Sequence, residues 1–221
     1  MKHLSTIIYY TSNREDEKFE KKIQQKILEN SGGLPIISVS QKSIDFGENL
    51  CIGDVGVSNQ NCFRQQQIGA EHAKTPYIIM AEADFLYPPE YFQFVPPKEK
   101  PYRLDNIWIM YRDSVAGFVQ KSYSEGASIY PREFFIKQIE RRLKGRGYWN
   151  TEMEKYKAVP RMFYKPWHEV EFFHLENPAV SIKTKEGMHK YTGVIKDQDP
   201  EGARSLPYWG DVKKLRKELF T

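Results

Sequence analysis

The chain has 221 residues, of which 40% are hydrophobic and 28% are charged, and its formal net charge is +4. These values exclude a globally disordered chain, and we expect a single domain of 221 residues. Two cysteines are too few for a disulfide scaffold, so we expect a reducing, cytoplasmic compartment. No apolar run reaches the roughly 20 residues that span a bilayer, so we expect no membrane partner.

The first predicted elements are a strand and a helix. Residues 4–10 are short, β-branched and aromatic, which suits a buried strand. The polar residues 11–14 offer N-cap side chains, and the acids at 15–17 place negative charge in the first helical turn, where the macrodipole favours it. The apolar positions of this helix recur every four residues, at Phe19, Ile23 and Ile27. Gly32 and Gly33 end the helix.

A second strand, a loop, a helix and a third strand follow. Residues 36–39 form an apolar strand, and the stretch at 45–58, rich in Gly and Asn, is typical of a loop. Residues 59–73 lack Pro and favour a helix. Residues 77–81 form a continuous apolar run, as in a central parallel strand that is covered on both faces. This alternation predicts an α/β fold with βαβ units and a doubly wound sheet.

The second half of the chain is less regular. Residues 106–111 and 117–122 are compatible with two paired strands, and residues 131–144 predict a helix with one apolar side. After Trp149 the chain is polar, aromatic and rich in Pro and Gly until a basic helix at 211–220. We therefore expect an irregular C-terminal extension on a single α/β domain.

Two acids directly follow the apolar run at 77–81. Glu82 and Asp84 are two positions apart, so in an extended chain both carboxylates point the same way. Ligands of an open α/β sheet bind beyond the carboxyl ends of its strands, which is where these acids lie. Carboxylate oxygens suit Mg²⁺ or Mn²⁺, and such an ion can bridge the oxygens of a diphosphate. The pair therefore predicts a metal site, and a chance pair at a strand end is the alternative.

The context of these acids resembles the family-two-like glycosyltransferases with the GT-A fold. Their pattern is a helix ending in Ala-Lys, an apolar strand, an acid-x-acid motif and a Pro that opens the next segment. Here the pattern is Ala73-Lys74, residues 77–81, Glu82-Ala83-Asp84 and Pro88. The resemblance implies a GT-A-like mixed sheet, mainly parallel, and transfer of a sugar from a nucleotide-diphosphate sugar such as a UDP-sugar. The first acid is Glu, where the family usually has Asp.

The resemblance extends to about residue 140 and implies two halves, residues 1–100 for the nucleotide sugar and residues 101–221 for the acceptor. It places donor contacts after the first strand, after the second strand, at the start of the helix at 59–73, and at the first acid. The residues at these places are Thr11, Ser12, Asn13, Arg14, Ser40, Asp45, Asn61, Arg64 and Glu82. Helix capping or a surface ion pair is the alternative role for several of them.

A transfer that inverts the sugar's configuration needs a carboxylate that deprotonates the acceptor hydroxyl. In similar enzymes this base follows an acceptor-side segment that ends in an Arg-containing helix start, which residues 126–133 resemble. Glu152 and Glu154 come next along the chain. Neither matches the adjacent acid pair of the family, and we take Glu152 as the candidate base, with a solvated helix start as the alternative.

The C-terminal region of many such enzymes supplies a further ligand to the metal or the diphosphate. His189 follows a Gly-Met pair in a loop-like segment, and it is our candidate metal ligand, ahead of His174 and His168. Lys190 is the neighbouring residue, and we expect its charge to neutralise the diphosphate of the donor. An ordinary surface histidine is the alternative reading of His189.

The acceptor has no motif of its own. Basic clusters at 141–146 and 213–217 suit a polyanion, and the arrangement resembles small phage-type GT-A enzymes that glycosylate hydroxymethylated pyrimidines in DNA. A flipped base would stack on aromatic side chains, and the available rings are Tyr148, Trp149, Trp167 and Trp209. Solvated helix faces are the alternative for the basic clusters, and saccharide or protein acceptors are the alternatives to DNA.

Three other classes of protein share some of these features. A sugar nucleotidyltransferase needs a Gly-rich, Arg-containing loop after its first strand, and residues 11–14 are not such a loop. A metal-dependent nuclease usually has a Lys close behind its acid pair, where this chain has residues 85–87, Phe-Leu-Tyr. A non-catalytic DNA-binding protein is the alternative that the basic clusters alone would support, and its binding would need neither nucleotide sugar nor metal.

Overall fold

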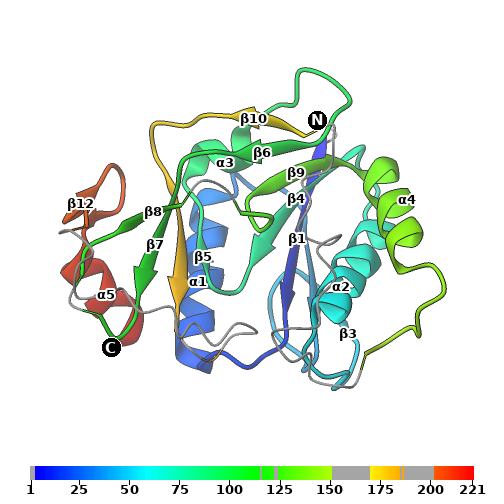
Figure 1. The fold of residues 1–221 in the computed structure, drawn as a ribbon, viewed down its shortest axis with the longest axis horizontal. Coiled ribbons are helices and arrows are strands. Elements are labelled where there is room, and N and C mark those ends of the chain that lie inside the picture. The colour runs from blue at the N-terminus through cyan, green and yellow to red at the C-terminus, as the bar shows by residue number, and fades with distance from the viewer. Residues whose placement is uncertain (1–2, 115, 122–123, 151–169, 185, 187–201) are drawn as a thin grey trace.

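The computed structural model describes residues 3–114, 116–121, 124–150, 170–184, 186 and 202–221. A seven-stranded sheet lies beside a four-stranded sheet (Figure 1). In spatial order, the large sheet contains β10 (Glu171–Phe173), β6 (Tyr102–Leu104), β9 (Ser128–Pro131), β4 (Tyr77–Glu82), β1 (Ser5–Thr11), β2 (Ile36–Ser40) and β3 (Glu48–Cys51). The small sheet contains β5 (Phe85–Leu86), β11 (Ala179–Lys183), β7 (Ile107–Tyr111) and β8 (Val119–Lys121), and β12 (Ser205–Leu206) pairs with β13 (Gly210–Asp211).

The large sheet is mixed and mainly parallel. Strands β4, β1, β2 and β3 are parallel neighbours, whereas β9 runs antiparallel to β4 and β6. Helix α1 (Glu17–Asn30) packs on one face, and α2 (Asn59–His72) and α4 (Arg132–Leu143) pack together on the other. The short helix α3 (Pro89–Gln93) follows β5. The predicted α/β fold, with a mixed sheet flanked by helices, is confirmed.

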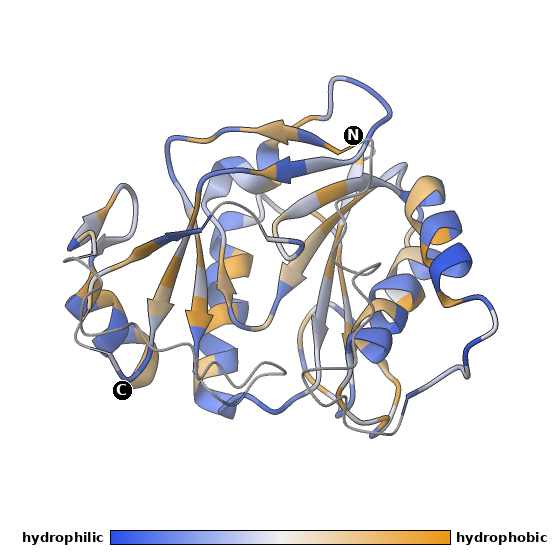
Figure 2. Cartoon of the chain, in the orientation of Figure 1, coloured by the Kyte–Doolittle hydropathy of each residue, from blue (hydrophilic) through white to orange (hydrophobic). Residues whose placement is uncertain are grey.

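Residues of β1 alternate between two hydrophobic clusters. Ile7 and Tyr9 lie in the cluster that contains the apolar stripe of α1, whereas Ile8 and Tyr10 lie in the cluster that contains residues of α2 and α4. All four side chains are at most 5% exposed. Figure 2 shows hydrophobic residues gathered in strands such as β7 and β11, and hydrophilic residues on the outer sides of the helices. The central strands are therefore covered on both faces, as their continuous apolar runs predict.

Two details of the N-terminal half differ from the prediction. The stretch expected to be a loop contains β3, a short edge strand whose residues are exposed or half-buried, so it lacks the apolar signal of a central strand. The cap of α1 is Asp16, whose side chain accepts a hydrogen bond from the backbone N–H of Phe19, and not a residue of the polar turn 11–14. Asp16, which the sequence predicts within the first helical turn, is therefore the N-cap residue that precedes that turn.

The second half is more regular than predicted. The expected pairing of β7 with β8 and the helix α4 are confirmed, and the apolar side of α4 is buried. Part of the stretch expected to be irregular forms regular strands, because β10 joins the large sheet beside β6 and β11 lies between β5 and β7. These strands of three and five residues are too short to stand out in a sequence that is otherwise polar and Pro-rich.

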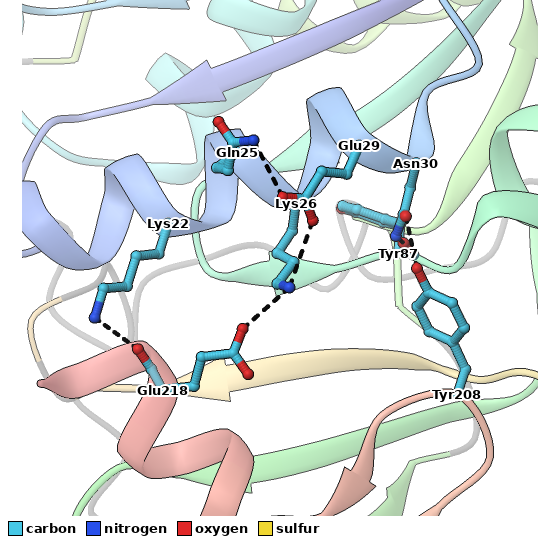
Figure 3. A network of polar contacts seen from close by, with 8 residues as sticks. All are labelled: Lys22, Gln25, Lys26, Glu29, Asn30, Tyr87, Tyr208 and Glu218. Atoms are coloured by element: carbon cyan, nitrogen blue, oxygen red, sulfur yellow. Dashed lines mark hydrogen bonds and ion pairs between the residues drawn. The ribbon is translucent and has the colours of Figure 1, made fainter.

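The C-terminal helix α5 (Val212–Phe220) packs against α1, at the other end of the chain. Figure 3 shows Lys22 and Lys26 of α1 reaching Glu218: the Lys22 ammonium donates to the Glu218 carbonyl at 2.6 Å, and Lys26 lies 3.0 Å from its carboxylate. The rings of Phe19 and Phe220 stack with their centroids 4.9 Å apart. No helix in the described ranges is both long and apolar enough to cross a membrane.

Candidate functional site

A cavity of about 490 Å³ opens at the carboxyl ends of β1 and β4. Its walls come from the turn after β1, the N-terminal part of α2, the turn after β4, the segment that leads into β9, and the end of β11. This volume is in the range of small-molecule sites, and the edge of the sheet is where α/β proteins place their ligands. The cavity is therefore the candidate functional site.

Both predicted acids line this cavity. Glu82 is the last residue of β4, and Asp84 follows in the turn before β5. The turn is held by β11, because the backbone N–H of Ile182 donates to the Asp84 carbonyl at 2.7 Å. The structure thus brings together two carboxylates that the sequence places at a strand end.

The carboxylate of Glu82 is closely surrounded. The hydroxyl of Tyr10 donates to its Oε1 at 2.7 Å. The hydroxyl of Tyr87 accepts the backbone N–H of Glu82 at 2.9 Å and donates to the Gly126 carbonyl at 2.6 Å. Residue 126 has no room for a side chain, because a Cβ there would lie 2.5 Å from the Glu82 carboxylate. Glu82 is therefore fixed between β1 and the segment that enters β9.

Electrostatics make this pair receptive to a cation. Burial, helped by the nearby charge of Asp84, raises the pKa of Glu82 to about 7 against the opposing effect of the hydrogen bond from Tyr10. A divalent ion between the two carboxylates would remove their repulsion. Within the described part of the chain no group of three His, Cys, Asp or Glu side chains could hold a metal. The residues fit an ion that takes two protein carboxylates and completes its shell with water and substrate phosphate, as Mg²⁺ does.

Two further acids line the cavity, and sequence reasoning assigned neither of them to the site. Burial raises the pKa of Glu15 to about 7 against the opposing effect of a hydrogen bond with Thr184. Burial also raises the pKa of Glu125, and the charge of Arg103 opposes this shift. Arg103 is fully buried, with its guanidinium 3.9 Å from the Glu125 carboxylate. The cavity therefore has four carboxyl groups, so an anionic ligand can bind there only together with cations.

Two lysines supply positive charge, and sequence reasoning missed both. Lys183, the last residue of β11, lies 3.4 Å from Oδ2 of Asp84. Lys121 ends β8, and burial and the charge of Lys183 lower its pKa. Both lysines belong to the small sheet, whose strand β11 was not predicted. The one sequence signal for Lys183 is a cation at the end of a five-residue run that is otherwise nearly apolar.

The predicted donor contacts after β1 and β2 divide into two groups. Thr11 and Ser12 line the cavity. Asn13 has a left-handed φ of 53° and braces the turn, because its side-chain oxygen accepts the backbone N–H groups of Gln41 and Lys42. Four of the predicted donor contacts lie outside the cavity lining, namely Asn13, Arg14, Ser40 and Asp45. The hydroxyl of Ser40 is buried and donates to the Lys42 carbonyl, which explains why it does not reach the cavity.

The predicted contacts at the start of α2 hold another segment of the chain. Asn61 lines the cavity, and its side chain exchanges two hydrogen bonds with the backbone of Asn150, at 2.7 and 2.8 Å. Arg64 lies outside the lining and donates to the Tyr148 carbonyl and to the side chain of Gln67. These two residues fasten residues 147–150 to α2, a role that local sequence could not indicate.

Several other predicted residues lie elsewhere. Trp209 is wrongly predicted as a stacking surface, because it is only 8% exposed and its indole N–H donates to the Pro178 carbonyl. His174 is exposed, pairs with Asp105 at 2.8 Å and does not line the cavity. The remaining predicted residues fall outside the described ranges: Glu152, Glu154, Trp167, His168, His189 and Lys190.

No protein-family model matches the sequence, and no curated protein matches it. Among solved structures, S. aureus TarS 1-349 is 10% identical, with a TM-score of 0.51 over 81% of this chain and 60% of that chain. The chain therefore spans less than two thirds of that TarS fragment.

Two further solved structures are similar over most of the chain. An inositol-1-phosphate CTP transferase from T. maritima is 10% identical, with a TM-score of 0.48 over 82% of this chain and 89% of that one. A glycosyltransferase involved in the glycosylation of the major capsid of PBCV-1 is 9% identical, with a TM-score of 0.47 over 81% and 93%. Glycosyltransferases and nucleotidyltransferases are thus the structural neighbours, and the predicted GT-A-like fold is confirmed.

Proposed function

We propose that this chain is a metal-dependent glycosyltransferase that uses a nucleotide-diphosphate sugar, a UDP-sugar, as its donor. One observation carries the proposal: Glu82 and Asp84 share a cavity at the carboxyl edge of the sheet, beside the ammonium of Lys183. Paired carboxylates that can hold a divalent ion, with a lysine next to them, suit a ligand whose leaving group is a diphosphate.

The residues of the chain have distinct proposed roles. Glu82 and Asp84 hold Mn²⁺ or Mg²⁺, which when bound stabilises the charge that develops on the diphosphate. Ser12, in the turn after β1, would offer its hydroxyl to the nucleotide, and Thr11, the last residue of β1, would line the nucleotide while its hydroxyl holds the Asn13 N–H. Outside the described ranges, His189 remains the predicted third ligand, Lys190 a predicted diphosphate contact and Glu152 the predicted base.

The turn after β1 favours a diphosphate donor over a nucleoside triphosphate. Residues 11–16 contain no glycine, and Asn13 is committed to the backbone of Gln41 and Lys42. A turn of this kind cannot fold around three phosphates as a Gly-rich loop does. We therefore place sugar transfer ahead of nucleotidyl transfer.

The proposed acceptor is a hydroxymethylated base in DNA. Arg141, Lys144 and Arg146, at the end of α4 and just after it, are exposed and precede Tyr148. Tyr148 is 56% exposed and has the guanidinium of Arg64 4.8 Å from its ring centroid. Two residues further on, Asn150 contacts Asn61 in the cavity wall. A basic segment with an exposed ring at the edge of the cavity suits a DNA strand with a flipped base.

The experiment is a transfer assay with two DNA substrates. The protein is incubated with Mn²⁺, a panel of nucleotide sugars and either plain DNA or DNA with hydroxymethylcytosine, and the nucleosides are weighed by mass spectrometry. A hexose-sized gain on the modified base, with release of nucleoside diphosphate, is the expected result. A gain on added saccharide or protein instead would keep the class and replace the acceptor.

Two other outcomes would contradict the class itself. Release of pyrophosphate from a nucleoside triphosphate and a sugar phosphate would identify a nucleotidyltransferase. DNA binding that needs neither nucleotide sugar nor metal, without any transfer, would identify a non-catalytic DNA-binding protein. Asp84→Asn should abolish transfer, whereas the matched control Asp105→Asn changes an exposed acid outside the cavity and should not.

A further inference from the structure

Lys183 occupies a place that a metal ion would need. Its ammonium lies 3.4 Å from Oδ2 of Asp84, and the two side chains are only 15% and 23% exposed. The small sheet holds Lys183 next to Asp84, because Ser181 of β11 pairs with Phe85 of β5. The backbone N–H of Ile182 also donates a hydrogen bond to the Asp84 carbonyl. The carboxylate proposed for metal binding therefore already has a cation beside it.

A lysine and a divalent ion repel one another when they approach the same carboxylate. Asp84 is held by the short turn between β4 and β5, whereas the lysine ammonium is a compact charge on a flexible four-carbon stem. The lysine is therefore the partner that can move aside. The free-energy cost of moving the Lys183 ammonium away from Asp84 is low only if another anion within its reach replaces Asp84 as its partner.

The cavity also needs an anion for a second reason. Lys121 lines the same cavity, and the charge of Lys183 contributes to lowering its pKa, so the two ammonium groups repel each other. Among the described residues the Lys121 ammonium has neither an ion pair nor a hydrogen bond. A ligand with two negative charges between these lysines would remove that repulsion.

We propose that Lys183 is an exchangeable cation: it pairs with Asp84 in the ligand-free protein and moves to the diphosphate of the donor when the donor and the metal bind. This inference rests on the proposed function. Oδ2 of Asp84 then becomes available to the metal, so that each ligand favours the binding of the other. Coupling of this kind is reciprocal, and it makes free nucleoside diphosphate and Mn²⁺ bind cooperatively.

The test measures Mn²⁺ alone and UDP in separate titrations, by electron paramagnetic resonance and by calorimetry. Lys183→Met removes the competing charge, so Mn²⁺ alone should bind roughly ten-fold more tightly than to the wild type. UDP at saturating Mn²⁺ should bind roughly ten-fold more weakly, because the diphosphate loses a cation. Opposite shifts in the two affinities are the expected result, and a lysine that only supports the fold would not produce them.

Three other variants complete the design. Lys183→Arg keeps the charge and should leave Mn²⁺ affinity close to that of the wild type. Lys121→Met should weaken UDP and should tighten Mn²⁺ alone by less than Lys183→Met does, because the charge of Lys121 acts on both acids but forms an ion pair with neither among the described residues. Lys100→Met removes an exposed ion pair with Glu171 outside the cavity, and it should change neither affinity.

The outcomes separate this inference from the proposed function. If the wild type binds neither Mn²⁺ nor UDP, or if Asp84→Asn leaves Mn²⁺ binding intact, the proposed function is wrong and the exchange falls with it. If the wild type binds both and Lys183→Met binds Mn²⁺ no more tightly, the exchange alone is wrong. Lys183→Gln is a second neutral variant that gives the same readout should the methionine variant fail to fold.

Discussion

Gly126 lies directly against the carboxylate of Glu82. A methyl group at residue 126 would stand 2.5 Å from both Cδ and Oε2 of Glu82, closer than any carbon and oxygen pack. The carbonyl of Gly126 also accepts the hydroxyl of Tyr87, which in turn accepts the backbone N–H of Glu82. The absence of a side chain at this glycine therefore sets the position of a proposed metal ligand.

Gly126→Ala should displace the Glu82 carboxylate and lower kcat/KM by about 100-fold, the loss expected when a reacting group shifts by about 1 Å. Steady-state kinetics with Mn²⁺ and the donor measure the effect, and thermal unfolding checks that the fold persists. Gly147→Ala is the matched control, because a Cβ there meets nothing closer than the Trp149 carbonyl at 3.4 Å. Wild-type kinetics in Gly126→Ala would remove Glu82 from the site.

Mn²⁺ affinity should fall as the pH is lowered through about 7. Burial raises the pKa of Glu82 to about 7, so below that pH the carboxyl is protonated and protons compete with the metal. Each pH unit below 7 should weaken binding by up to about ten-fold. Titrations at several pH values between 5.5 and 8.5 test this, and an affinity that stays constant across that range would contradict it.

Tyr10→Phe provides a control for this pH dependence. The hydroxyl of Tyr10 donates to the Glu82 carboxylate and favours its ionised form, so its removal should raise the pKa of Glu82 further. The pH at which Mn²⁺ affinity falls should then move upward. A downward movement, or no movement, would mean that another group governs the profile.

The central strands and the acid pair could be predicted because their signals are local. A strand covered on both faces is a continuous apolar run, and Glu82 and Asp84 follow such a run directly. Lys183 could not be predicted, because it reaches Asp84 from 99 positions away through the pairing of β5 with β11. Both strands are short, and no local pattern specifies which strand a two-residue segment will pair with.

The hydrogen-bond partners of polar side chains near the cavity could not be predicted from the sequence either. Asn61 and Arg64 were expected to approach the nucleotide, yet both fasten residues 147–150 to α2. Ser40 was expected near the base and ribose, yet its hydroxyl is bound to the Lys42 carbonyl inside the fold. Position along the chain brought these side chains close to the cavity, but competition from nearby backbone groups decided their partners.

The side chain of Asn61 should contribute to the stability of the fold. Its amide N–H groups donate to three carbonyls, those of Val55, Gly56 and Asn150, and the side chain is 1% exposed. Asn61→Ala should lower the free energy of unfolding by about 1–3 kcal/mol, because buried carbonyls lose their donor. Asn61→Asp should cost more, since it turns an oxygen toward those carbonyls.

Urea unfolding compares these variants with Arg64→Ala, whose exposed hydrogen bond to the Tyr148 carbonyl should contribute less than about 1 kcal/mol. If Asn61→Asp were as stable as Asn61→Ala, the three donated hydrogen bonds would not form in solution. The hydrogen bond from Asn61 to the Asn150 carbonyl would then be absent, and Gln60 and Arg64 would still tie α2 to the Gly147 and Tyr148 carbonyls.

The two basic clusters should differ in their effect on DNA. Figure 1 shows α4 and α5 at opposite ends of the molecule, and the segment after α4 is the one that contacts the cavity wall. Replacing Arg141, Lys144 and Arg146 by Ala should weaken DNA binding. It should also reduce the slope of log affinity against log salt by about 0.9 for each phosphate that the variant no longer neutralises.

The matched control also removes three charges, from Lys213, Lys214 and Lys217, which are exposed on α5. This variant should leave DNA binding close to that of the wild type. Salt titrations of DNA affinity measure both variants. An equal loss in both would show that DNA is held by diffuse charge, without a preferred approach to the cavity.

An anomalous difference map from a crystal grown with Mn²⁺ and a UDP-sugar would locate the metal and the donor at once. We expect a Mn²⁺ peak within about 2.5 Å of carboxylate oxygens of both Glu82 and Asp84, with the diphosphate of the donor bound to the same ion. A Mn²⁺ ion or a nucleotide sugar bound elsewhere on the protein, with this cavity vacant, would contradict it.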